Sequence, residues 1–95
     1  MSAYYIATPI EIMDPDGMKE YATGSHDVLE SFGGRYLMQR APAECLAGDW
    51  KPKYLTILEF PSKQRLLEWY DSDAYRPWRE LRERSARASI VVTEA

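Results

Sequence analysis

Two charged residues in strand-like surroundings are the leading candidates for chemistry. Glu59 lies in the segment 54–60, which is otherwise apolar, aromatic or β-branched. A carboxyl group in an apolar setting is costly to ionise unless it is paired, and its pKa tends to rise, which suits acid–base chemistry. Arg35 follows two glycines, and its guanidinium suits bidentate binding of a ligand carboxylate. The alternative is that Arg35 forms a structural ion pair with Glu59 or Asp49.

His26 is the only histidine and Cys45 the only cysteine of the chain. His26 lies at the edge of a predicted helical stripe, where it is either a general base beside a cleft or an ordinary helix-edge residue. A metal site needs several clustered ligands, which one histidine and one cysteine do not supply, so we predict no metal and no cofactor. Haem is disfavoured by the poor placement of the histidine, and flavin is left open. Cys45 has no neighbouring base and is interpreted as an inert thiol.

Aromatic residues make up 13% of the chain, which predicts either a compact core or an aromatic-lined cavity. Tyr5 and Tyr36 are the stronger candidates for a pocket, because each combines a strand position with a hydroxyl that needs a partner when buried. Trp50 and Trp69 are further candidates for its walls. The helical spacing of Trp69 also fits simple packing between a helix and the sheet.

The hydrophobic pattern predicts the elements that position these residues. β-Branched and aromatic runs indicate strands, and apolar residues with a 3.6-residue period indicate helices. Asp14 and Pro15 are typical of a helix start, and Gly33 and Gly34 of a helix end. Strands are expected at 4–10, 35–40, 53–60 and 89–94, and helices at 15–32, 63–70 and 74–86.

The resulting order, βαββαβ, predicts an α+β fold of the ferredoxin-like kind in a single domain over residues 1–95. Right-handed crossovers place the helices on one face of a four-stranded antiparallel sheet. The strands at 4–10 and 53–60 are apolar on both faces, so the face without helices would be a large exposed apolar patch in a monomer. We therefore expect a homodimer that forms through the open sheet face.

Charge and composition exclude several classes of partner. The net charge of −3 and the pI of about 5.1 disfavour nucleic-acid binding, and the late cluster of arginines is interleaved with glutamates, which is typical of a solvated helix face with ion pairs. No apolar stretch is long enough to span a membrane, and no signal peptide is recognisable. With a single cysteine, these features predict a cytoplasmic protein.

Several strings taken together resemble the domain-of-unknown-function family numbered 1330, within the dimeric α+β barrel superfamily. They are Gly33-Gly34-Arg35-Tyr36-Leu37, Gly48-Asp49-Trp50, Leu58-Glu59-Phe60-Pro61-Ser62 and Trp69-Tyr70. The resemblance runs from the first expected strand to the last and implies a ferredoxin-like dimer. The wider superfamily includes cofactor-free monooxygenases, isomerases, haem enzymes and stress-response proteins, so membership does not select a reaction.

Three functions are consistent with the sequence. The first is a homodimer that binds a small organic molecule between sheet and helices, with Arg35, Glu59 and Tyr36 as its polar groups. The second is a cofactor-independent enzyme of monooxygenase or isomerase type, with Glu59 or His26 as general base. The third is a structural or interaction module without a pocket.

Overall fold

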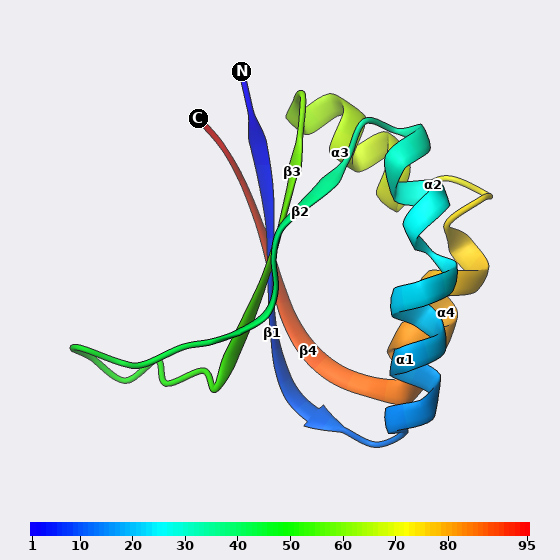
Figure 1. The fold of residues 1–95 in the computed structure, drawn as a ribbon. Coiled ribbons are helices and arrows are strands. Elements are labelled where there is room, and N and C mark those ends of the chain that lie inside the picture. The colour runs from blue at the N-terminus through cyan, green and yellow to red at the C-terminus, as the bar shows by residue number, and fades with distance from the viewer.

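The computed structural model describes residues 1–95 and contains a strongly curved sheet with helices on one face only (Figure 1). The strands follow the order β2-β3-β1-β4, and every neighbouring pair is antiparallel. The predicted ferredoxin-like βαββαβ arrangement is confirmed. The elements are β1 (Ala3–Ile12), α1 (Pro15–Gly24), α2 (His26–Ser31), β2 (Arg35–Pro42), β3 (Tyr54–Phe60), α3 (Lys63–Tyr70), α4 (Arg76–Ser85) and β4 (Ala86–Glu94).

The register of the strands divides the sheet into a helix-covered face and an open face. Tyr5 of β1 pairs with Leu58 of β3, and both side chains are buried under the helices. Side chains alternate along a strand, so the next pair, Ile6 and Ile57, lies on the open face. Ile6 also pairs with Val91 of β4. These residues form an apolar row across the open face.

The helix expected at 15–32 is divided into α1 and α2 at Ser25. The Ser25 hydroxyl donates a 2.6 Å hydrogen bond to the Tyr21 carbonyl, a local contact that tends to bend helices. Gly24 lies against the ring of Trp78 on α4, where a Cβ would come within 2.1 Å of the ring. The missing side chain therefore lets α4 approach at the point where the chain bends.

The end of α2 follows the glycine signal of the sequence. Gly33 has a φ of 81°, the left-handed conformation that glycine adopts at low cost. Its N–H donates to the Glu30 carbonyl at 2.9 Å, and the N–H of Gly34 donates to the Leu29 carbonyl at 3.0 Å. This pair of bonds is the Schellman motif, which satisfies carbonyls that the helix leaves free.

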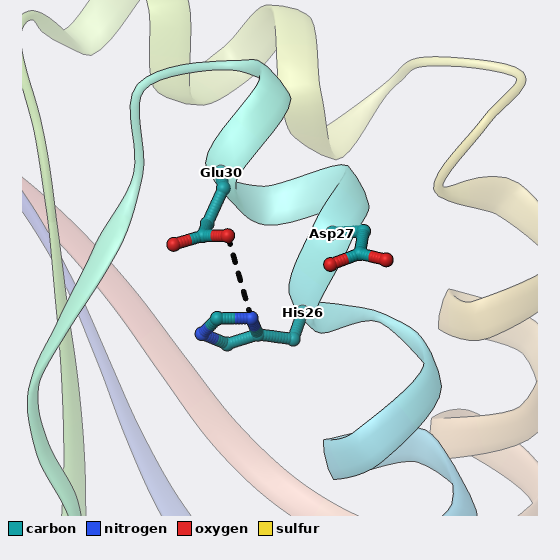
Figure 2. A group of neighbouring side chains, drawn as sticks. All are labelled: His26, Asp27 and Glu30. Carbon is teal, nitrogen blue, oxygen red and sulfur yellow. Dashed lines mark ion pairs between the residues drawn. The ribbon is translucent and has the colours of Figure 1, made fainter.

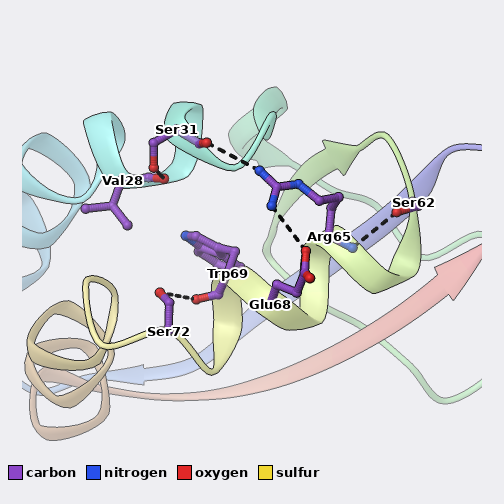
Figure 3. Close-up of polar contacts among 7 residues, drawn as sticks. All are labelled: Val28, Ser31, Ser62, Arg65, Glu68, Trp69 and Ser72. Atoms are coloured by element: carbon purple, nitrogen blue, oxygen red, sulfur yellow. Dashed lines mark hydrogen bonds and ion pairs between the residues drawn. The ribbon is translucent and has the colours of Figure 1, made fainter.

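A polar bridge ties α3 to the end of α2 (Figure 3). Arg65 donates to the Ser31 carbonyl at 3.4 Å and to the Glu68 carboxylate at 3.1 Å, and its guanidinium lies over the Phe32 ring at 5.0 Å. The Ser62 hydroxyl caps α3 by accepting from the Arg65 N–H at 3.1 Å. These contacts of Arg65 connect α3 to the C-terminal end of α2.

Aromatic side chains dominate the core between α3 and the sheet. Trp69 is 1% exposed and lies with its ring centroid 4.1 Å from that of Tyr75 and 5.1 Å from that of Phe60. Tyr5 meets Trp69 edge-on, with centroids 5.5 Å apart. Leu66 fills the same cluster and is fully buried.

None of the helices is long and apolar enough to cross a membrane.

Truncation of Leu66 tests this core. We expect Leu66→Ala to lower the free energy of unfolding by about 2–5 kcal/mol, because it removes buried methyl groups and leaves a cavity. The neighbouring Leu67 is 42% exposed, so Leu67→Ala should cost less than about 0.5 kcal/mol. Urea denaturation of the two variants measures both values, and equal losses would contradict the described packing of α3.

Candidate functional site

A cavity of about 730 Å³ lies between the helix-covered face of the sheet and α1. Its walls are mostly apolar and include Ala7 of β1, Met18 and Ala22 of α1, and Ile90 of β4. Binding sites for small molecules typically have volumes of about 300–1,000 Å³ and similar walls with a few polar anchors. The cavity therefore has the size and lining of a small-molecule site.

Buried tyrosine hydroxyls supply polar groups to this cavity. Tyr21, which lines it, shares a 2.6 Å hydrogen bond between hydroxyls with Tyr75. Burial raises the pKa values of Tyr5, Tyr21 and Tyr75 above their ordinary value. These phenols are therefore neutral at physiological pH and act as hydrogen-bonding groups rather than as charges.

Arg82 of α4 lies among these tyrosines and also lines the cavity. It is 8% exposed, and its Nη2 donates to the Tyr70 hydroxyl at 3.3 Å. The sequence-based interpretation placed Arg82 on a solvated, ion-paired helix face, and for this residue it is wrong. Tyr75, Trp78, Arg82 and Ser85 follow one helical stripe, and this spacing was the available signal that Arg82 faces inward.

An irregular part of β2 contributes to the cavity lining. The pairing of β2 with β3 shifts register twice between Tyr36 and Ala41. Arg40 has a φ of 49°, and its N–H donates to the Thr56 hydroxyl at 3.0 Å. Bulges of this kind redirect side chains and occur often beside binding sites. Here the irregularity brings Arg40 to the cavity lining, which also includes Lys19 of α1.

Of the residues proposed from the sequence, Tyr5 and Tyr36 lie in the cavity wall. Tyr5 is 3% exposed and is held between the aromatic core and the cavity. Tyr36 is half-buried, and burial raises the pKa of its hydroxyl. Both are strand residues of the helix-covered face, as their register with Leu58 requires.

Glu59 and Arg35 do not lie in this cavity. They are paired in register on the open face, where the Arg35 Nε donates to the Glu59 carboxylate at 2.7 Å. The expectation of a raised pKa for Glu59 is wrong, because the hydrogen bond from Arg35 holds the pKa of this carboxyl below its ordinary value. The geometry is that of the structural ion pair considered as the alternative.

His26 is an exposed residue of α2, next to Glu30 on the same helix (Figure 2). It is not among the residues that line the cavity. Its Nδ1 is 3.6 Å from the Glu30 carboxylate, and its ring stacks parallel to that of Tyr36 with centroids 6.2 Å apart. Ligand atoms of His26, Asp27 and Glu30 lie within 4.8 Å of one another, and all three residues are exposed. Exposed acidic groups gathered on one short helix are common without a metal.

The remaining candidates lie away from the cavity. Trp69 belongs to the core described above. Trp50 is 63% exposed and lies in the connection between β2 and β3, residues 43–53, which extends away from the helices (Figure 1). We call this connection the arm. Cys45, also in the arm, directs its Sγ toward the carbonyls of Ala47 and Gly48 at 3.5 and 3.4 Å.

Solved structures with the same fold are similar to the chain at low sequence identity. RPA0582 of Rhodopseudomonas palustris, a protein of unknown function, has a TM-score of 0.75 and 19% identity, with 99% of this chain and 82% of that chain covered. SnoaB of Streptomyces nogalater, a cofactor-independent oxygenase, has a TM-score of 0.70 and 8% identity, with coverage of 99% and 92%. A dimeric ferredoxin-like protein of unknown function from Jannaschia sp. CCS1 has a TM-score of 0.63 and 13% identity, with both chains covered completely.

Comparison with curated proteins finds no match. The family model that matches is DUF1330, a domain of unknown function, and it spans residues 2–95. The resemblance to this family that the sequence indicated is thereby confirmed. The chain belongs to the DUF1330 family.

Proposed function

We propose that the chain is the subunit of a homodimer that binds a small organic molecule in the cavity between the sheet and α1. The observation that carries this proposal is the cavity of about 730 Å³, which has apolar walls and tyrosine hydroxyls in its lining. An apolar ligand body would replace water against Met18 and Ile90, and the hydroxyls of Tyr36 and Tyr21 would orient its polar atoms.

The open sheet face supports the homodimer. Met38, Ile57, Ile6 and Val91 form a row across all four strands, and Val91 is 59% exposed. A contiguous apolar surface of this kind is typical of an interface. The protein from Jannaschia is described as dimeric, which agrees with this use of the shared fold.

The arm presents further exposed apolar side chains on the open side of the sheet. Leu46 is 92% exposed and Trp50 63% exposed, and the arm projects on the side of the sheet opposite the helices (Figure 1). Large apolar side chains in such a position gain by burial against another surface. In the proposed dimer, the arm packs against the partner subunit.

A cofactor-independent enzyme is the second candidate, favoured by the structural similarity to SnoaB. It requires a base that reaches the cavity. Glu59 lies on the open face with a lowered pKa. His26 does not line the cavity, and its ring stacks against that of Tyr36 with centroids 6.2 Å apart. Ligand binding is therefore better supported than turnover. A module without a pocket is the alternative that a failure of ligand binding would favour.

Ligand binding is tested by filling the cavity from α1. Ala22 lines the cavity, whereas its neighbour Thr23 is exposed and does not. We expect native mass spectrometry of gently purified protein to detect a small-molecule adduct. Ala22→Trp should lose this adduct because the indole occupies ligand space, and Thr23→Trp should retain it. Retention of the adduct in both variants would place the ligand outside this cavity. A wild type that carries no adduct and binds no member of a fragment library would contradict the proposal.

The homodimer is tested by a charge on the open face. We expect the wild type to elute with a mass of about 22 kDa by light scattering, twice the 11.0 kDa subunit. Val91→Glu should shift the protein to a monomer, because it buries an unpaired carboxylate in the apolar row. Leu67→Glu adds the same charge on the helical side and should leave the dimer intact. A wild type that is monomeric at micromolar concentration would refute the proposed interface.

The role of Glu59 is tested by the pH dependence of stability. Its folded-state pKa is below the ordinary value of 4.5, so the ion pair stabilises the protein above that pH and the contribution disappears as the pH falls through the lower value. At equal protein concentration, the melting temperature of the wild type should exceed that of Glu59→Gln at neutral pH. The difference should disappear once the pH has fallen below the lowered pKa of Glu59.

Glu11→Gln is the control for this measurement, because its pair with Arg87 is longer, at 3.5 Å, and exposed on both sides. It should show a smaller difference at neutral pH. Since Glu59 lies outside the cavity, Glu59→Gln should also bind ligand as the wild type does. Loss of turnover in this variant with binding retained would instead support the enzyme.

A further inference from the structure

Arg82 differs from the other arginines of the chain in being buried without an acidic partner. No carboxylate lies within ion-pairing distance of it, and it is 8% exposed. Arg40 and Arg84 are also unpaired, but both are exposed to water. The arginines that pair with acidic side chains are Arg35, Arg65, Arg76, Arg79 and Arg87.

The hydrogen-bonding capacity of Arg82 is largely unused. A guanidinium carries five N–H donors and stays charged at any physiological pH. The structure provides the Tyr70 hydroxyl as an acceptor for Nη2, whereas the buried Nε has no acceptor at all. A buried charge is costly unless it is paired and hydrogen-bonded. A ligand anion beside this guanidinium would match its charge and accept from its free N–H groups.

The charged side chains that line the cavity are predominantly positive. The charged residues that line it are Asp16, Lys19, Arg40 and Arg82, which sum to three positive charges and one negative. The whole chain has a net charge of −3, so this local excess of two positive charges runs against the overall balance. A lining of this kind attracts and retains anions.

Resting on the ligand-binding function proposed above, we propose that the ligand is a small organic carboxylate and that the Arg82 guanidinium anchors its carboxylate group. The apolar walls at Met18, Ala22 and Ile90 accommodate an aromatic or aliphatic body. A planar carboxylate matches the planar fork of a guanidinium, and the hydroxyl of Tyr36 or Tyr21 provides a further donor. Arg82 is thus a specificity-determining residue of the cavity.

The test compares matched ligands and matched variants. The probes are benzoate and 2-naphthoate with their primary amides, which keep the shape and remove the charge. We expect the wild type to bind a carboxylate about tenfold to 100-fold more tightly than its amide, the range for a hydrogen bond to a charged group. Arg82→Met should abolish this preference. Arg84→Gln removes the same charge from the exposed side of α4 and should preserve it.

Two further readouts separate anchoring from a structural role. The ¹⁵N–¹H resonance of the Arg82 Nε in the wild type should shift on addition of the carboxylate and not of the amide. The melting temperature of ligand-free Arg82→Met should equal or exceed that of the wild type, because the variant removes an unpaired buried charge. A lower melting temperature with carboxylate binding unchanged would assign Arg82 a structural role and overturn the inference.

The failure of this inference is distinguishable from failure of the binding function. If carboxylate and amide bind equally and Ala22→Trp prevents both, the cavity binds ligands but Arg82 does not select anions. If no probe binds the wild type and no adduct is found, both proposals fall. Because the carboxylate and amide comparison uses the wild-type protein alone, the inference stays testable even if Arg82→Met does not fold.

Discussion

The packing of Trp69 against Tyr75 and Phe60 is the interaction on which the helical layer depends. With ring centroids 4.1 and 5.1 Å apart, these side chains join α3 and the start of α4 to the sheet. The helix α1 packs against α4 instead, where Gly24 receives the ring of Trp78. Since α1 packs mainly against α4, space remains between α1 and the sheet, and this space is the cavity.

Each strand contributes side chains both to the helix-covered face and to the open face of the sheet. Leu58 and Glu59 are neighbours on β3, yet one packs under the helices and the other pairs with Arg35 on the open face. The strict alternation of strand side chains makes this separation unavoidable. A residue can therefore belong to the cavity or to the proposed interface, and the register alone decides which.

Buried tyrosine hydroxyls and the Arg82 guanidinium beside the cavity lower the stability of the fold unless they are hydrogen-bonded. The tyrosine hydroxyls satisfy one another in part, as the 2.6 Å contact between Tyr21 and Tyr75 shows. Arg82 is satisfied less well, because its partners are the neutral hydroxyls of Tyr70 and Tyr75 and its buried Nε has no acceptor. A chain selected for stability alone would gain by replacing such a residue with an apolar one. Its presence beside a cavity agrees with the anion-binding role proposed above.

The amino-acid sequence by itself determined the order of strands and helices and the helix end at Gly33, because periodicity and glycine conformation are local properties. It also placed Glu59 near Arg35, since neighbouring strands bring them into register. Only the tertiary structure decided that this pair lies away from the cavity and that Arg82 faces into it. Packing between segments distant in the chain decides which side of the sheet is covered by the helices. It also decides which charged residue of a helix faces the sheet. The helical spacing of Arg82 was a local signal that it faces inward, but the cavity itself is formed by segments distant in the chain and became visible only in the folded protein.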